Sequence, residues 1–297
     1  MPKLLAWPAL VLALMLGFSD FSSAADSLGP AGLRTQYASL GQQLASSALR
    51  GPMVLMSQEA GHSVQGDLYA VLNHPMSVLS AALADPAQWC DILILHLNNK
   101  QCRPEQTGAG TVLELKVGKT YAQPVEEASA IRFSWKAPEV RTDYVAMQMV
   151  AAKGPYDTQD YRLTAEAVPL EGNRSFLHMS YSLGYGNAGQ VALSLYFGTS
   201  GRDKVGFSSA EPPSTASPFV GGVRGLVERN TMRYFLAVDA YLQALSAPPD
   251  QRVQRRLETW FDATEKYPRQ LHEQERADYL RMKRNDVQRQ AAAQAPR

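Results

Sequence analysis

The chain has little cysteine and little excess charge of either sign. Only two cysteines, Cys90 and Cys102, occur in 297 residues, and the five histidines are scattered along the sequence. A zinc site needs Cys and His side chains at ligand spacing, so this scarcity argues against a metal centre. The 29 basic and 28 acidic residues give a net charge of +1. Nucleic-acid-binding domains usually carry a concentrated basic face, so we expect no nucleic-acid partner.

The familiar catalytic and cofactor motifs are missing as well. There is no G-x-S-x-G elbow, no Walker loop and no H-E-x-x-H pair. Gly184, Gly186 and Gly189 match the spacing of a dinucleotide fingerprint, but no strand–helix–strand unit surrounds them. A turn between a hairpin and a helix explains these glycines better. We therefore expect no cofactor and assign no catalytic residue.

Long apolar runs are absent except at the N-terminus. Residues 4–18 are almost entirely apolar, Lys3 precedes them, and the small residues of 22–25 follow. The run has about 15 residues, shorter than the roughly 20 that a membrane-spanning helix needs. This pattern is typical of a signal peptide cleaved after Ala24 or Ala25, which predicts export to the periplasm. A retained N-terminal anchor is the alternative.

Export changes the interpretation of the two cysteines. In an oxidising compartment, an isolated pair such as Cys90 and Cys102 usually forms a disulfide. In the chain-entropy model, closing a loop of this length contributes roughly 2–3 kcal/mol to the free energy of unfolding.

The most informative pattern lies between Val64 and Cys102. Residues 64–72 alternate apolar and polar, which predicts a strand with one solvated face. Asn73 and Pro75 are typical of a helix start, and a helical pattern with a break at Asp85 follows. The apolar run at 92–98 is interpreted as the next strand.

The rest of the chain adds strands and then helices. Strand patterns fall at residues 111–117, 130–135, 144–150, 161–168 and 175–185, joined by short turns that predict antiparallel hairpins. Residues 220–247 have the three-to-four spacing of a long amphipathic helix. Further helices are predicted at residues 33–49, 250–264 and 268–290.

This order of strand, helices, strands and long helix resembles the START-like or polyketide-cyclase (SRPBCC) superfamily. The resemblance covers residues 63–247 and implies an α+β helix-grip fold, in which a curved antiparallel sheet wraps around a long C-terminal helix and encloses a cavity. Residues 1–25 are then the signal peptide, 26–62 an N-terminal helical extension and 248–297 a C-terminal helical tail. The family has no single transferable set of binding residues, so none is carried over.

The candidate site consists of side chains that the sheet and the long helix would direct inward. On the strand at 175–185, Tyr181 shares the more apolar face, while His178 is expected on the outer face. On the long helix, Glu228 and Arg229 belong to a polar band that we expect on the exposed face. The alternative is that Asn230 or Arg233 of this band reaches the cavity. The candidate ligand-binding residues are Phe133, Trp135, Met147, Met149, Leu163, Tyr181, Asn230, Thr231, Arg233 and Tyr234.

Three functions fit this interpretation. The first is a periplasmic binding or carrier protein for a hydrophobic, lipid-like ligand. The second is a cyclase or hydrolase, which would need titratable groups such as Asp91, His96, Glu166 and Arg233 to meet in one pocket. The third is an envelope interaction protein that docks a partner through the mixed-charge tail at residues 250–290.

Overall fold

The computed structural model describes residues 27–199, 201–210 and 217–294. The predicted signal peptide at residues 1–25 lies outside them. Within the described residues, no helix combines the length and the apolar character needed to cross a membrane.

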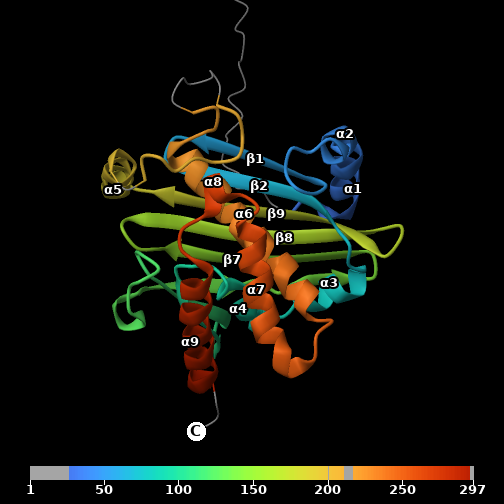
Figure 1. The fold of residues 1–297 in the computed structure, drawn as a ribbon. Coiled ribbons are helices and arrows are strands. Elements are labelled where there is room, and N and C mark those ends of the chain that lie inside the picture. The colour runs from blue at the N-terminus through green and yellow to red at the C-terminus, as the bar shows by residue number, and fades with distance from the viewer. Residues whose placement is uncertain (1–26, 200, 211–216, 295–297) are drawn as a thin grey trace, which may run out of the picture.

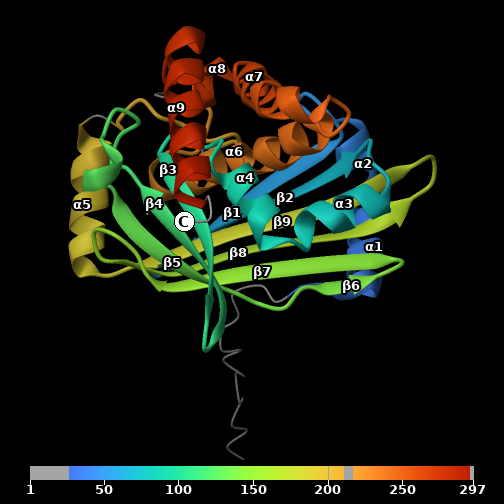
Figure 2. The ribbon, with the colours of Figure 1, turned by 90° about the horizontal axis from the view of Figure 1, so that it is seen from below.

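A curved antiparallel sheet forms the centre of the molecule (Figure 2). Its nine strands lie in the order β1-β2-β9-β8-β7-β5-β4-β3, with the short β6 paired to β7. The strands are β1 Met53–Ala60, β2 Ser63–Leu72, β3 Asn99–Thr107, β4 Gly110–Val117, β5 Ser129–Trp135, β6 Glu139–Arg141, β7 Tyr144–Lys153, β8 Thr158–Leu170 and β9 Arg174–Tyr185. The predicted antiparallel pairing is confirmed: short turns join β7 to β8 and β8 to β9, whereas residues 118–128 form a longer connection between β4 and β5.

The long helix α6, Gly222–Ala244, crosses one face of this sheet and is covered by the C-terminal helices (Figure 1). Val227, Thr231, Tyr234 and Val238 are buried against the sheet, as the helical spacing predicts. The other helices on this face are α3 Met76–Leu83, α4 Pro86–Leu93, α7 Arg252–Thr264, α8 Pro268–Leu271 and α9 Arg276–Gln294. The predicted helix-grip architecture is thereby confirmed.

Two features at the N-terminal side of the fold differ from the sequence prediction. Strand β1 pairs with β2 along its whole length, so the sheet begins at Met53 rather than at residue 63. The apolar run at 92–98 is not a strand but the end of α4 and the turns after it, and β3 starts at Asn99. A short run that is buried on all sides has no periodicity to separate a strand from a helix.

The outer face of the sheet is also partly covered. Helices α1, Gly29–Ser39, and α2, Gly41–Ala45, lie against it at one end (Figure 2). They form a second, smaller core in which Leu33 and Leu40 pack with Tyr144 and Phe176. The expectation of one solvated sheet face is therefore wrong for this end of the sheet.

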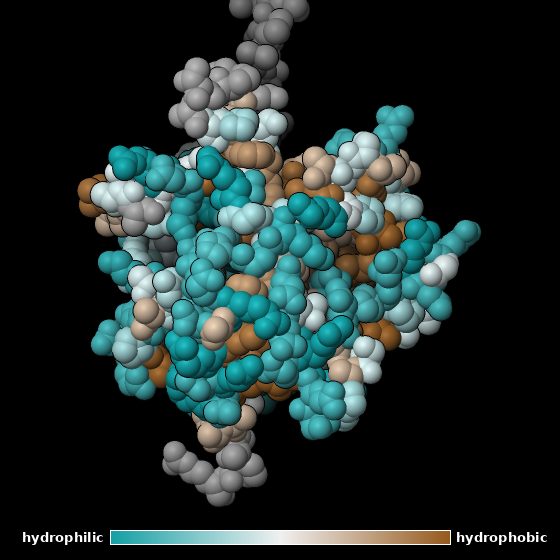
Figure 3. Space-filling model, viewed as in Figure 1, coloured by the Kyte–Doolittle hydropathy of each residue, from teal (hydrophilic) through white to brown (hydrophobic). Residues whose placement is uncertain are grey.

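The C-terminal helices belong to the main core. Trp260 of α7 and Tyr279 of α9 are buried and stacked on each other, with ring centroids 5.1 Å apart. The Tyr279 hydroxyl donates to the Leu95 carbonyl oxygen at 3.0 Å. The view in Figure 3 shows the outer side of these helices as mostly hydrophilic. The tail is thus no free arm, and a docking partner would have to bind this outer side.

The structure joins Cys90 and Cys102 in a disulfide that links α4 to β3. The two Cα atoms are 5.1 Å apart, within the range that disulfides require. Both residues are buried, so the bond lies inside the core rather than on the surface.

Candidate functional site

A cavity of about 210 Å³ lies between the sheet and α6. It is bounded by strands β4, β5, β7, β8 and β9 on one side and by α6 and the end of α4 on the other. Its apolar walls include Leu115, Ile131, Phe133, Met149, Leu163 and Leu183. Proteins usually bind small ligands in concave, mostly apolar spaces of this kind that contain a few polar groups.

Six of the predicted ligand-binding side chains line this cavity. They come from four strands and from α6, which shows that the alternation along each strand identified the inner face correctly. These residues are Phe133, Met149, Leu163, Tyr181, Asn230 and Tyr234.

Two predicted residues of the sheet do not line the cavity. Met147 is buried two residues before Met149 on the same face of β7, but it packs in the solid part of the core. Trp135 lies at the end of β5 and is partly exposed. Alternation fixes the face of a strand to which a side chain belongs, but not the position of the cavity along that strand.

Two predicted residues of α6 also lie elsewhere. The Thr231 hydroxyl donates to the Val227 carbonyl oxygen at 2.8 Å. It faces β2 so closely that a Cβ at Gly66 would lie 2.5 Å from the Thr231 Oγ1. The guanidinium of Arg233 turns toward the C-terminal region, where Nη2 pairs with Glu273 Oε1 at 2.9 Å.

The polar band expected on the exposed side of α6 is in fact buried. Glu228 accepts hydrogen bonds from the backbone N–H groups of Phe207 and Ser208, and Arg229 donates to the Val205 carbonyl oxygen. The segment before α6 folds over the first half of the helix and supplies these partners. The local residue pattern of α6 does not indicate this cover.

His96 forms the polar end of the cavity. Its side chain is 7% exposed, and burial, assisted by the positive charge of Arg233, lowers its pKa to about 3. The imidazole is therefore neutral at pH 7. Its Nδ1 accepts a hydrogen bond from the Asn98 backbone N–H at 3.2 Å, so Nε2 carries the proton. Nε2 is buried and makes no hydrogen bond of normal geometry with the described residues, although the Asn230 side chain lies close enough to oppose the fall in pKa.

Three tyrosines surround the space next to His96. Tyr161, Tyr181 and Tyr234 line the cavity, with the Tyr181 and Tyr234 ring centroids 5.4 Å apart. Burial raises the pKa of Tyr234 to about 12 and that of Tyr181 well above its usual value. Their hydroxyls therefore stay protonated near neutral pH, and with His96 they make this end of the cavity rich in hydrogen-bond donors.

The acid–base candidates do not meet in this cavity. Asp91 forms an ion pair with Arg256 at 2.7 Å on the outer side of α4, and Arg233 is paired with Glu273. Glu166 belongs to the opposite face of the sheet. Of the four residues considered for catalysis, only His96 lines the cavity.

Glu166 instead belongs to a charge network beneath α1 that the sequence analysis missed. His178 lies between two carboxylates, with Nδ1 2.9 Å from Glu166 Oε1 and Nε2 2.9 Å from Asp67 Oδ1. Tyr144 and the backbone N–H of Leu28 also donate to Glu166. Phe176 was the sign in the sequence that this sheet face is covered, because it is a large apolar residue on the face that we expected to be solvated.

Burial alone would lower the pKa of His178, but the hydrogen bonds to Asp67 and Glu166 outweigh it, and the net shift is upward. Burial would raise the pKa of Glu166, yet His178, the Leu28 N–H and Tyr144 lower it overall. The two carboxylates therefore favour the protonated form of His178. Across the part of the chain that the structure describes, no group of His, Cys, Asp and Glu side chains is arranged to hold a metal ion.

Comparison with known proteins finds similarity only among solved structures. No family model matches the chain, and no curated protein sequence matches it. A START superfamily protein from Mycobacterium smegmatis aligns at 11% identity and TM-score 0.38, over 63% of this chain and all of that one. The ZhuI aromatase/cyclase of a Streptomyces species aligns at 15% identity and TM-score 0.32, over 48% of this chain and 73% of that chain.

A truncated norcoclaurine synthase from Thalictrum flavum aligns at 11% identity and TM-score 0.32, over 46% of this chain and 87% of that one. The assignment of the fold comes from the architecture itself, in which β1 to β9 curve around α6 and leave a cavity between them. The described residues therefore have the α+β helix-grip architecture that the sequence predicts.

Proposed function

We propose that this chain is an exported binding or carrier protein that holds a small hydrophobic molecule between its sheet and α6. The observation that carries the proposal is an apolar cavity whose one polar end contains a buried donor, the His96 Nε2–H, that makes no hydrogen bond of normal geometry with the described residues. An unpaired polar group costs roughly 1–3 kcal/mol when it is buried. A ligand that accepts a hydrogen bond there would recover this cost.

The cavity volume limits the ligand. An engineered cavity of about 150 Å³ holds one benzene molecule. The 210 Å³ found here would therefore hold a single substituted ring or a short chain. A lipid with full-length acyl chains would require the cavity to expand. We therefore favour a compact apolar molecule that carries a carbonyl or ether oxygen toward His96.

Ligand binding is favoured over catalysis because the cavity offers donors but no second titratable group beside His96 that is set to exchange protons. Tyr181 and Tyr234 keep their protons near neutral pH, and His96 stays neutral. Such groups orient and select a ligand without moving protons.

Native mass spectrometry of protein purified without denaturation tests the proposal directly. We expect a bound mass that organic extraction releases and that the apo protein rebinds. Sequencing the N-terminus of periplasmic material tests export in the same sample, with a start just after Ala24 or Ala25 as the expected result.

A matched pair of variants separates a ligand cavity from a solid core. Met149→Trp places an indole in the cavity, so it should abolish binding of the extracted ligand while keeping the fold. Met147→Trp, on the same face of β7 but outside the cavity, should destabilise the protein by about 1–3 kcal/mol through overpacking. If Met149→Trp binds the ligand as well as the wild type does, the proposal is wrong.

A further inference from the structure

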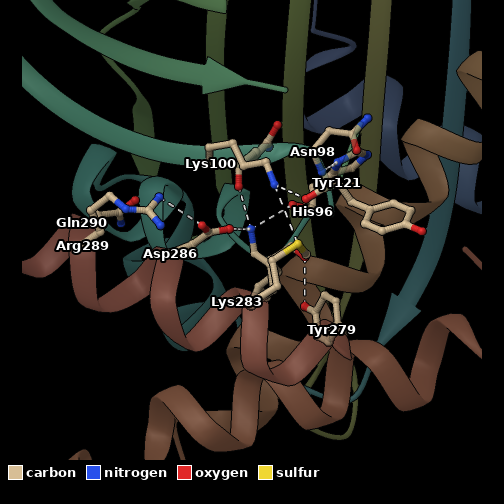
Figure 4. Close-up of polar contacts among 12 residues, drawn as sticks. His96, Asn98, Lys100, Tyr121, Tyr279, Lys283, Asp286, Arg289 and Gln290 are labelled. Carbon is tan, nitrogen blue, oxygen red and sulfur yellow. Dashed lines mark hydrogen bonds and ion pairs between the residues drawn. The ribbon is translucent and has the colours of Figure 1, made fainter. Parts of the chain in front are cut away.

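A second hollow lies on the far side of the segment that carries His96. It is a groove of about 410 Å³ between α9 and residues 121–125, and Lys100 forms its floor. His96, Asn98 and Asn99 line the central cavity, whereas Lys100 lines only the groove. Figure 4 shows His96, Asn98 and Lys100 with the α9 side chains that approach them.

Lys100 is a buried lysine without a carboxylate of the described residues at ion-pair distance: burial lowers its pKa, and Asp286, which is engaged elsewhere, opposes this shift only from a distance. Its side chain is 3% exposed, and Nζ donates to the Tyr121 carbonyl oxygen and approaches Met282 Sδ at 3.7 Å. An ammonium has three N–H donors, and a thioether is a weak acceptor, so Lys100 retains bonding capacity.

The backbone is shaped to admit this lysine. A Cβ at Gly118 would lie 3.1 Å from the Lys100 Cε and 2.7 Å from the Thr120 carbonyl oxygen. The backbone oxygen of Thr120 thus requires glycine at this position, and the lysine stem lies against that glycine.

The acidic residues of the groove are already engaged. Asp286 accepts from Lys283 at 2.9 Å and from Arg289 at 3.2 Å, and Asp278 pairs with Arg281. Three positive side chains, Lys100, Arg281 and Arg289, face two negative ones, Asp278 and Asp286, so the lining carries a net charge of +1. The ammonium of Lys283 behind Asp286 adds a further positive charge.

The groove also contains an unused neutral donor and an apolar wall. Gln274 Nε2 is buried without a hydrogen-bond partner in the described part of the chain. Pro124, Val125 and Met282 supply apolar surface beside it. Donors without acceptors, a positive charge and an apolar wall together fit an organic anion.

We propose that this groove is a binding site for a small organic anion, a phosphate or carboxylate on a compact apolar body, anchored by Lys100 and Gln274. The anion would lie at ion-pair distance from Lys100, where none of the described residues places a carboxylate. The site is separate from the central cavity and does not depend on what that cavity binds.

Titration calorimetry of the full mature chain with phenyl phosphate, benzoate and inorganic phosphate tests the proposal. We expect one of the two aromatic anions to bind, with inorganic phosphate weaker because it lacks the apolar body. Preference for phenyl phosphate assigns a phosphate ligand, and preference for benzoate assigns a carboxylate. Lys100→Met should weaken that binding by about 10- to 100-fold, the value of a hydrogen bond to a charged group.

Arg132→Met is the matched control. It also removes one positive charge, but Arg132 pairs with Glu105 and Glu114 on the outer strands, away from the groove. It should bind the anion as the wild type does. Thermal melts verify folding, and Gln274→Glu, which places a carboxylate in the groove, should weaken binding even if Lys100→Met fails to fold.

Three results would overturn the proposal. One is the absence of binding of every probe to the wild type. Another is unchanged binding by a folded Lys100→Met or Gln274→Glu variant. The third is an equal loss in Arg132→Met, which would indicate a general charge effect rather than a site.

Discussion

Replacing His178 by Gln tests the charge network beneath α1. The change removes the positive charge that lies 2.9 Å from both Asp67 and Glu166 and leaves two carboxylates without a counterion. Breaking a buried pair in this way typically costs about 3–5 kcal/mol. Glu166 keeps its hydrogen bonds from Tyr144 and Leu28, so we expect a loss near the lower value, about 3 kcal/mol.

Urea denaturation measures this loss, and hydrogen exchange locates it. Leu28 and Gly29 donate to Glu166, so the amides of α1 should exchange faster in the variant, whereas those of α6 should change less. His272→Gln is the control, because His272 pairs with Glu265 on the surface and should contribute less than about 1 kcal/mol. Equal losses for the two variants would refute the reasoning.

The pH dependence follows from the direction of the pKa shifts. The pKa of His178 is raised in the folded state. Its contribution to the free energy of unfolding is therefore complete below the unfolded-state pKa of about 6.5 and disappears as the pH rises through the folded-state pKa. The pKa of Glu166 is lowered in the folded state. Its contribution to the free energy of unfolding is therefore present above the unfolded-state pKa and is lost as the pH falls through the folded-state pKa. The stability difference between wild type and His178→Gln should therefore shrink as the pH rises above neutrality. A difference that grows with pH would contradict the network.

Three further predictions concern other parts of the fold. Reducing the bond between Cys90 and Cys102 should lower the free energy of unfolding by roughly 2–3 kcal/mol, and peptide mapping without reductant should recover the two cysteines as one linked peptide. Thr231→Trp should destabilise the protein by about 1–3 kcal/mol without affecting ligand binding, because Thr231 faces Gly66 rather than the cavity; thermal melts with a ligand titration check both parts. Lys283→Met should cost several kcal/mol and expose α9 to proteolysis, since its buried ammonium bonds two carbonyl oxygens and a carboxylate.

The sequence predicted those strands and helices in which one side is more apolar than the other. Strands such as β7 and β9 alternate, and α6 repeats at helical spacing, so their inner faces could be assigned. The run at 92–98 could not be assigned, because it is apolar throughout and buried on every side. Local pattern also cannot report cover by distant segments. This is why the burial of His178 under α1 and of Glu228 under the segment before α6 was missed.

The candidate site was predictable in the same limited sense. Tyr181 and Met149 were placed correctly, because the more apolar face of a strand points inward. His96 was considered only as an acid–base candidate and not as a ligand-binding residue, because it was expected on a strand, whereas its position depends on the turns after α4. Met147 shows what the pattern could not predict, because a side chain on the correct face can still pack in a solid region of the core.

The attachment of α9 to β3 has a consequence for how the polypeptide acquires its structure. The Gln290 side chain accepts from the Cys102 backbone N–H, a contact that spans 188 residues, and Lys283 reaches the His96 carbonyl oxygen across 187 residues. Contacts so far apart in the chain form late and slow the folding reaction. A folding intermediate in which α9 has not yet packed would leave the edge of β3 and Lys100 open to water. The core around β3 should therefore be complete only after α9 has docked.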